Sequence, residues 1–125
     1  MTPLVFVALS LAGGVGAVAR FMLDGAIRAV RPVALPLGTI LINLSGSLLL
    51  GLAVGLADAA VLPEAARVIV GTGFLGGYTT FSASSVETVR LLQERRGGLG
   101  LLNSIGLLVG CALLAWVGLG LGSLA

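Results

Sequence analysis

The charged residues of this chain leave long stretches without any charge, and these stretches constrain the fold more than any other feature. The four stretches cover residues 1–19, 32–57, 68–86 and 97–125, with short charged segments between them. A helix needs about 20 apolar residues to cross the hydrocarbon of a bilayer, and each stretch supplies that length or nearly so. The sequence therefore predicts four transmembrane helices.

Composition supports the same fold class. The chain has 125 residues, of which 58% are hydrophobic and 10% charged. A soluble domain of this size cannot bury so much apolar surface in its own core, so lipid must cover the rest. We predict an all-α integral membrane protein of the plasma membrane, a single transmembrane domain over residues 1–125. The predicted helices cover roughly residues 3–22, 34–57, 65–93 and 98–122.

The third stretch departs from a regular helix. Gly71, Gly73, Gly76 and Gly77 precede the run Tyr78-Thr79-Thr80-Phe81-Ser82, which combines glycines with hydroxyl residues near the middle of the span. This pattern predicts a break in helix three near residues 76–80. Backbone freed from helical pairing at that depth must line a cavity or bind an ion, because lipid cannot satisfy it.

Charge and residue types exclude several classes of function. Seven arginines and five acids lie beside the apolar stretches, with no lysine and no histidine, which is the pattern of charges that flank membrane spans rather than of a nucleic-acid surface. No pair of acids lies close enough in sequence to form an enzyme site. Cys111, the only cysteine, is interpreted as a small packing residue.

Polar residues inside the spans are the candidate functional groups, because such residues usually face a bundle interior or a pore. Ser45, Ser47 and Ser85 either do so or bond carbonyls of their own helix. The Asn43 amide needs a partner helix or a passing anion to satisfy its donors. The whole set is Arg20, Asn43, Ser45, Ser47, Thr79, Thr80, Ser82, Ser84, Ser85 and Glu87.

Glycines at four-residue spacing predict close contacts between helices. The clearest pairs are Gly51 with Gly55 and Gly106 with Gly110. Small residues let helix backbones approach each other in lipid, where the hydrophobic effect does not drive helices together.

Three segments together resemble the Fluc (CrcB-like) fluoride channels. They are GGVGAVARF at 13–21, GTILINLSGSLLLG at 38–51 and GTGFLGGYTTFSASSVE at 71–87, in the family's order and spacing. The resemblance implies four helices per subunit, two subunits inserted antiparallel, and fluoride pathways along the subunit interface.

The resemblance also implies roles for individual residues. Asn43 matches the pore asparagine, Phe81 the first of two pore phenylalanines, Arg20 the vestibule arginine, and Glu87 the acid that follows. Hydroxyls of Thr80, Ser82 and Ser84 complete the implied pore set. A structural Na⁺ on the dimer axis would be held by backbone carbonyls near Gly77 and Thr79, which suits a hard cation.

Two features depart from the family. Ser84 stands where a second pore phenylalanine is usual, and alignment on Gly110 puts Leu102 and Gly106 at the positions of a tyrosine and a serine in helix four. That polar track is therefore predicted to be lost, unless rotation of the helix lets Asn103 and Ser104 replace it.

Arginines are unevenly distributed between the predicted loops. Five flank the loops after helices one and three, whereas only Arg67 flanks the other side, so both termini are predicted to lie outside the cytoplasm. A chain with one fixed orientation would need an oppositely oriented homologue for an antiparallel dimer. The first hypothesis is a subunit that passively exports fluoride, with itself or, preferentially, such a homologue as partner.

Two further hypotheses remain. The chain is alternatively a non-conducting subunit that supports the pore of its partner, as the residues at Ser84 and Gly106 suggest. A small multidrug exporter shares the size and helix number but requires an acid in its first helix, and no acid precedes Asp24.

Overall fold

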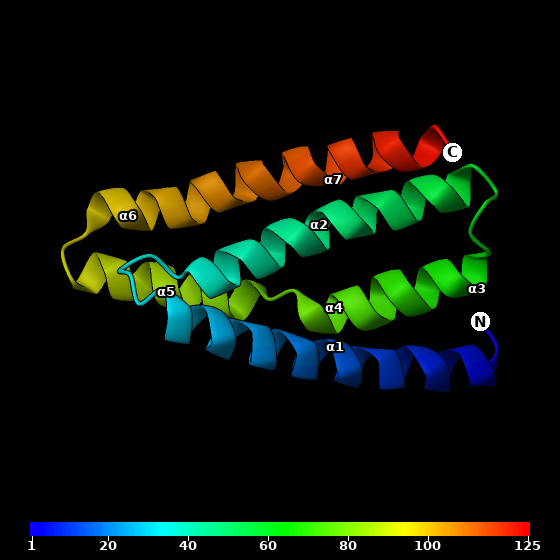
Figure 1. The fold of residues 1–125 in the computed structure, drawn as a ribbon, viewed down its shortest axis with the longest axis horizontal. Coiled ribbons are helices and arrows are strands. Elements are labelled where there is room, and N and C mark those ends of the chain that lie inside the picture. The colour runs from blue at the N-terminus through cyan, green and yellow to red at the C-terminus, as the bar shows by residue number, and fades with distance from the viewer.

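The computed structural model describes all 125 residues and consists of four helical segments, called spans below, with no strand (Figure 1). The all-α class and the broken third helix are confirmed. The elements are α1 (Pro3–Val30), α2 (Leu37–Asp58), a third span of α3 (Glu64–Arg67), η1 (Val68–Leu75), α4 (Gly76–Tyr78) and α5 (Phe81–Gln93), and a fourth span of α6 (Gly97–Leu101), η2 (Leu102–Gly106) and α7 (Leu107–Ser123), where η denotes π-helix.

Three of the spans are continuous helices, long and apolar enough to cross a membrane, and the third is divided at Thr79 and Thr80. Helix one ends later than its predicted limit near residue 22. It continues to Val30 because the charges beyond that limit are compatible with helix: Asp24 and Arg28 form an ion pair of 3.0 Å one turn apart.

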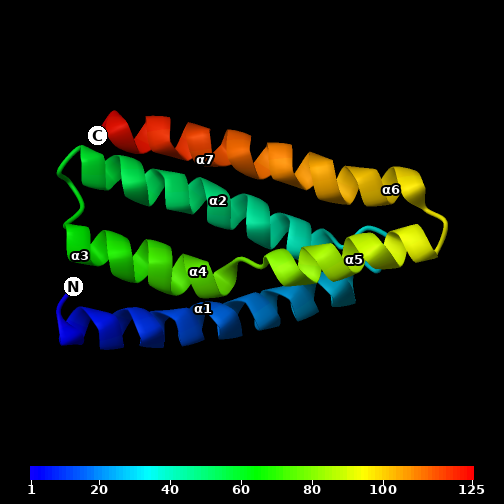
Figure 2. The ribbon, with the colours of Figure 1, turned by 180° about the vertical axis from the view of Figure 1, so that it is seen from behind.

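The spans lie side by side as a slab, in the order α1, third span, α2 and fourth span (Figures 1 and 2). Both termini lie at one end of the slab with the loop between α2 and α3. The loops at 31–36 and 94–96 lie at the opposite end, which we call the loop end. The five arginines that flank these loops are thus gathered at the loop end.

Glycines set the contact between α1 and the first half of the third span. Gly16 lies against the backbone of Phe74, and Gly77 against the backbone of Gly13, so that a Cβ on either glycine would overlap main-chain atoms. Close approach of two helix backbones gives dispersion contact where the hydrophobic effect contributes little.

A second glycine contact joins α2 to α7. Gly51 and Gly55, predicted as contact residues, pack against the backbone of α7, and Gly118 and Gly122 pack against the backbone of α2. Gly106 contacts no other helix of this chain, since its nearest neighbour is Leu102 of its own helix, whereas Gly110 lies against the Leu44 side chain of α2. The fourth span uses Gly118 and Gly122 because these face α2 along the crossing.

Few apolar side chains are buried between the spans. Ile42, Leu75 and Tyr78 form the buried apolar cluster, with Phe74 stacked on Tyr78 at a ring separation of 5.9 Å. Large apolar side chains of α1 and α7 are instead exposed on the outside. A hydrophobic outer surface of this extent is what lipid tails cover.

Candidate functional site

The break in the third span is the local feature from which the site is built. Thr79 and Thr80 both have extended backbone between α4 and α5. The Thr79 hydroxyl donates to the carbonyl of Leu75 at 2.9 Å, and the Thr80 hydroxyl accepts from the N–H of Ala83 at 3.2 Å. The threonines therefore stabilise the end of one half-helix and cap the start of the next.

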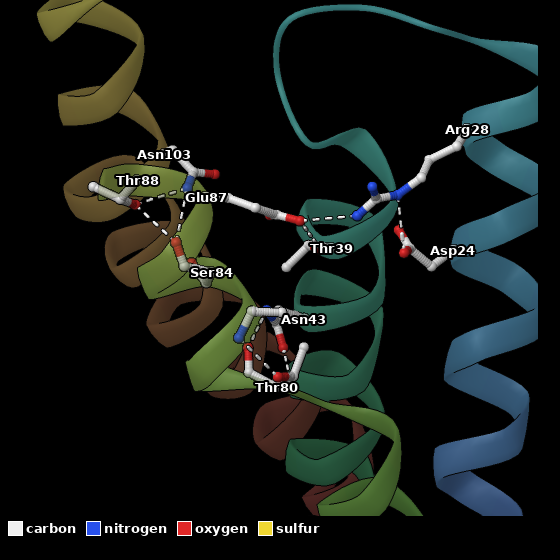
Figure 3. Close-up of polar contacts among 10 residues, drawn as sticks. Asp24, Arg28, Thr39, Asn43, Thr80, Ser84, Glu87, Thr88 and Asn103 are labelled. Atoms are coloured by element: carbon white, nitrogen blue, oxygen red, sulfur yellow. Dashed lines mark hydrogen bonds and ion pairs between the residues drawn. The ribbon is translucent and has the colours of Figure 1, made fainter. Parts of the chain in front are cut away.

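Asn43 lies on the neighbouring helix α2 and hydrogen-bonds to the backbone at the break (Figure 3). Its Oδ1 accepts from the N–H of Thr80 at 2.8 Å, and its Nδ2 donates to the carbonyl of Thr80 at 2.9 Å. The sequence predicted a partner helix or a passing anion for this amide, and the partner is the broken helix. One of the two N–H donors on Nδ2 remains for another ligand.

A groove of about 710 Å³ opens beside the break, between α2, α5 and the fourth span. Phe81 lies at its rim and is 88% exposed, so its ring faces away from the rest of the chain. Ser82 does not line the groove but its hydroxyl lies 3.3 Å from that of Thr80. Polar residues of the groove are Asn43, Ser47, Thr79, Thr80, Ser84, Ser85, Thr88 and Ser104.

Two alternatives were considered for Ser45, Ser47 and Ser85: a side chain that faces the interior or a pore, or one that bonds a carbonyl of its own helix. The structure shows examples of both. Ser85 donates to the carbonyl of Phe81 at 3.0 Å in its own helix. Ser45 donates to the carbonyl of Ile42 and also lies 3.1 Å from the Tyr78 hydroxyl. Ser47 forms no such bond and lines the groove, as does the half-buried Cys111.

Asn103 of the fourth span faces the interior, which fits the alternative in which rotation of this helix brings in Asn103 and Ser104. It is wholly buried, and its Nδ2 donates to the Thr88 hydroxyl at 2.8 Å and to the Ser84 carbonyl at 3.3 Å. Leu102, expected on the polar track, is 55% exposed, and Gly106 is also exposed. The π-turn η2 shifts the helical register, which turns Asn103 inward.

An ionic cluster lies toward the loop end (Figure 3). Glu87 Oε1 accepts from Arg28 at 3.1 Å and from the Thr39 hydroxyl at 3.0 Å, and Arg28 also pairs with Asp24. The resemblance assigns Arg20 and Glu87 to the vestibule and its ion pairing, and Glu87 forms its ion pair with Arg28. Arg20 forms no ion pair, and its Nε is buried without a partner.

Gly77 and Thr79, the residues predicted to hold Na⁺, lie at the end of α4 and directly after it. Because α4 ends at Tyr78 and Thr79 is extended, carbonyls of this last turn lack helical partners. Carbonyl oxygen is the ligand type that such cations prefer. The chain has no cluster of three acidic, histidine or cysteine side chains that would make a different metal centre.

A membrane helix broken beside a groove that several polar side chains line, with backbone released at the break, is typical of membrane proteins that conduct or transport ions. The family model described as "CrcB-like protein, Camphor Resistance (CrcB)" matches residues 7–119. The chain belongs to the CrcB-like family, and it is a multi-pass protein of the plasma membrane.

Relatives of known name agree with this assignment. The chain is 52% identical to fluoride-specific ion channel FluC 1 of Leifsonia xyli over 125 residues, covering 100% of this chain and 91% of that protein. It is 46% identical to FluC 2 of Cutibacterium acnes over 114 residues, with 90% and 93% covered. A FluC protein of Magnetococcus marinus is 41% identical over 117 residues, with 93% and 95% covered. These relatives are named as channels, which are transporters rather than enzymes.

Proposed function

We propose that this chain is a subunit of a passive, fluoride-selective channel that exports fluoride from the cytoplasm. The observation that carries the proposal is the groove at the helix break, where Asn43 is fixed on the Thr80 backbone and retains one N–H donor, in a chain of the CrcB-like family. The relatives named fluoride-specific ion channels indicate that the conducted ion is fluoride.

The groove offers the groups that a small, strongly hydrated anion requires. Fluoride must exchange water for other donors as it crosses, and the Asn43 amide and the hydroxyls of Thr80 and Ser84 are donors in the groove. The Ser82 hydroxyl lies outside the groove, beside that of Thr80. The Phe81 ring carries positive charge at its edge and so faces an anion favourably. Arg20 raises the local anion concentration at the vestibule. Glu87 joins α5 to α1 through its ion pair with Arg28.

A second subunit completes the pathway. Phe81 is exposed to 88% at the rim of the groove, so one chain supplies only one wall. An antiparallel partner would close the groove and bring a second set of carbonyls near Gly77 and Thr79 to the dimer axis. A structural Na⁺ held there would be coordinated by the carbonyl oxygens of both breaks.

The partner is an oppositely oriented homologue rather than a second copy. Arg28, Arg31, Arg90, Arg95 and Arg96 all lie toward the loop end, and such a bias gives a chain one orientation. An alternative function, a non-conducting subunit that supports its partner's pore, is favoured by Ser84, which lines the groove without the ring edge of a phenylalanine, and by Gly106, which has no side-chain donor.

Fluoride efflux from liposomes tests the proposal. Vesicles holding this chain alone, its homologue alone, or both are compared with a fluoride electrode, and chloride efflux is the selectivity control. We expect fast fluoride efflux only with both chains. Fast efflux with this chain alone contradicts the heterodimer, and absence of fluoride efflux in all three contradicts channel function. If the mixture conducts but loses no flux when Asn43 of this chain is replaced, the supporting role is correct.

A further inference from the structure

A series of polar contacts ties the end of α1 to α2 and α5, and it includes Asp24 and Arg28, which lie outside the implied pore set (Figure 3). Arg28 Nε lies 3.0 Å from Asp24 Oδ2, and Arg28 Nη2 lies 3.1 Å from Glu87 Oε1. The same oxygen of Glu87 accepts from the Thr39 hydroxyl at 3.0 Å. Glu87 of α5 is therefore joined to both α1 and α2.

Glu87 places a buried negative charge close to the proposed ion pathway. The residue is 8% exposed, and its carboxylate bonds to Thr39, which lies one turn before Asn43 on α2. One helical turn rises about 5.4 Å, so an ion held by the remaining Asn43 donor lies about 8 to 10 Å from this carboxylate. At such a distance and an effective dielectric constant of about 20, a like charge weakens binding about fifteen- to thirtyfold. Fluoride beside Asn43 therefore requires a cation that offsets Glu87.

Arg28 is the one cation paired with the Glu87 carboxylate. Arg90, one turn along the same helix, is exposed and forms no ion pair. The other carboxylate oxygen, Oε2, is buried without a hydrogen-bond partner, so no further donor of the chain stabilises the charge there. Compensation of this buried charge therefore depends chiefly on Arg28.

Asp24 orients the Arg28 side chain. That side chain is 59% exposed, and without a partner on its own helix it would be free to extend into the surroundings. The Asp24 carboxylate lies one turn earlier and packs against Gly38 at the start of α2, where an added Cβ would overlap it. The partial positive charge of a helix N-terminus favours a carboxylate in this place. Asp24 is thus held against α2 and holds the guanidinium toward Glu87.

The charges in this part of the molecule balance as a group. Arg20, one turn before Asp24 on α1, and Arg28 together offset the two acids, Asp24 and Glu87. Loss of Arg28 alone leaves an excess negative charge beside the pathway, whereas loss of the Glu87 charge alone leaves an excess positive one. Breaking the same ion pair from its two sides therefore changes the local charge in opposite directions.

We propose that Arg28, oriented by Asp24, compensates the charge of Glu87 and so allows fluoride to occupy the donors beside Asn43. This role depends on the proposed channel function. It is an electrostatic effect on the occupancy of the pathway, and it is separate from any contribution of the ion pair to holding the helices together.

Fluoride efflux from liposomes at a series of internal fluoride concentrations tests this role. Arg28→Gln should raise the half-saturating concentration about three- to tenfold, less than the unscreened repulsion, because Arg28 is 59% exposed and water screens its charge. Glu87→Gln should shift the half-saturating concentration in the opposite direction. The double variant with both substitutions should return close to the parent. A merely structural ion pair would be damaged alike from either side.

Arg31→Gln is the matched control, because it removes the same charge from the end of the same helix without breaking an ion pair. We expect it to stay within about twofold of the parent, since an exposed charge at a distance is screened. A rise of the half-saturating concentration in both Arg28→Gln and Glu87→Gln, or an equal rise in Arg31→Gln, would overturn the assignment. An unshifted Arg28→Gln in a conducting dimer contradicts this role alone, whereas a parent dimer that conducts no fluoride contradicts the channel function as well.

Discussion

Replacing Asn43 by alanine tests how the helix break and the ion pathway are coupled. The side chain bridges α2 to the third span through two hydrogen bonds to Thr80, of 2.8 and 2.9 Å. Alanine removes both bonds and leaves the N–H and carbonyl of Thr80 without partners at membrane depth. It also removes the remaining N–H that faces the groove.

The effect on stability and the effect on flux have separate causes. Hydrogen bonds between membrane helices average about 0.6 kcal/mol and reach about 1.7, so losing two costs about 1 to 3 kcal/mol. A lost donor to a charged ion costs about 1.5 to 3 kcal/mol. At the barrier for conduction, this lowers the rate by about tenfold to a hundredfold.

Fluoride efflux per assembled dimer is the measurement, with assembly checked by size-exclusion chromatography and stability by thermal unfolding in detergent. Ser47→Ala is the control, because Ser47 lines the groove one turn along α2 and forms no hydrogen bond to the protein. We expect flux within about twofold of the parent for the control. Equal flux per dimer in Asn43→Ala and the parent would refute the role of Asn43 in the pathway.

Three further outcomes are expected. Phe81→Ala, which removes an exposed ring at the groove rim, should suppress fluoride efflux without preventing dimer assembly; unchanged efflux would remove Phe81 from the pore. Gly77→Ala should lower stability by about 1 to 3 kcal/mol in thermal unfolding, because the added Cβ overlaps the Gly13 backbone, whereas Gly14→Ala, with open space around it, should not. Reporter fusions should place the C-terminus outside the cytoplasm, and a signal divided between both sides would contradict the fixed orientation.

Local features of the sequence were sufficient to predict the number of spans and the position of the break in the third one. Uncharged length determines which segments can cross a bilayer, and glycines followed by hydroxyl residues mark where a helix is weak. Asn43 was also singled out correctly as needing a partner, because an amide in lipid cannot satisfy its own donors. Each of these inferences depends on residues close together along the chain.

Contacts between spans could be decided only by the tertiary structure. Asn103 faces inward because a π-turn shifts the register of the fourth span, and nothing in the sequence around it indicated that turn. Glu87 pairs with Arg28, 59 residues away, because the ends of α1 and α5 meet at the loop end. Side chains three or four residues apart share a helix face, so a small change in register or crossing decides which of them meets the neighbouring span.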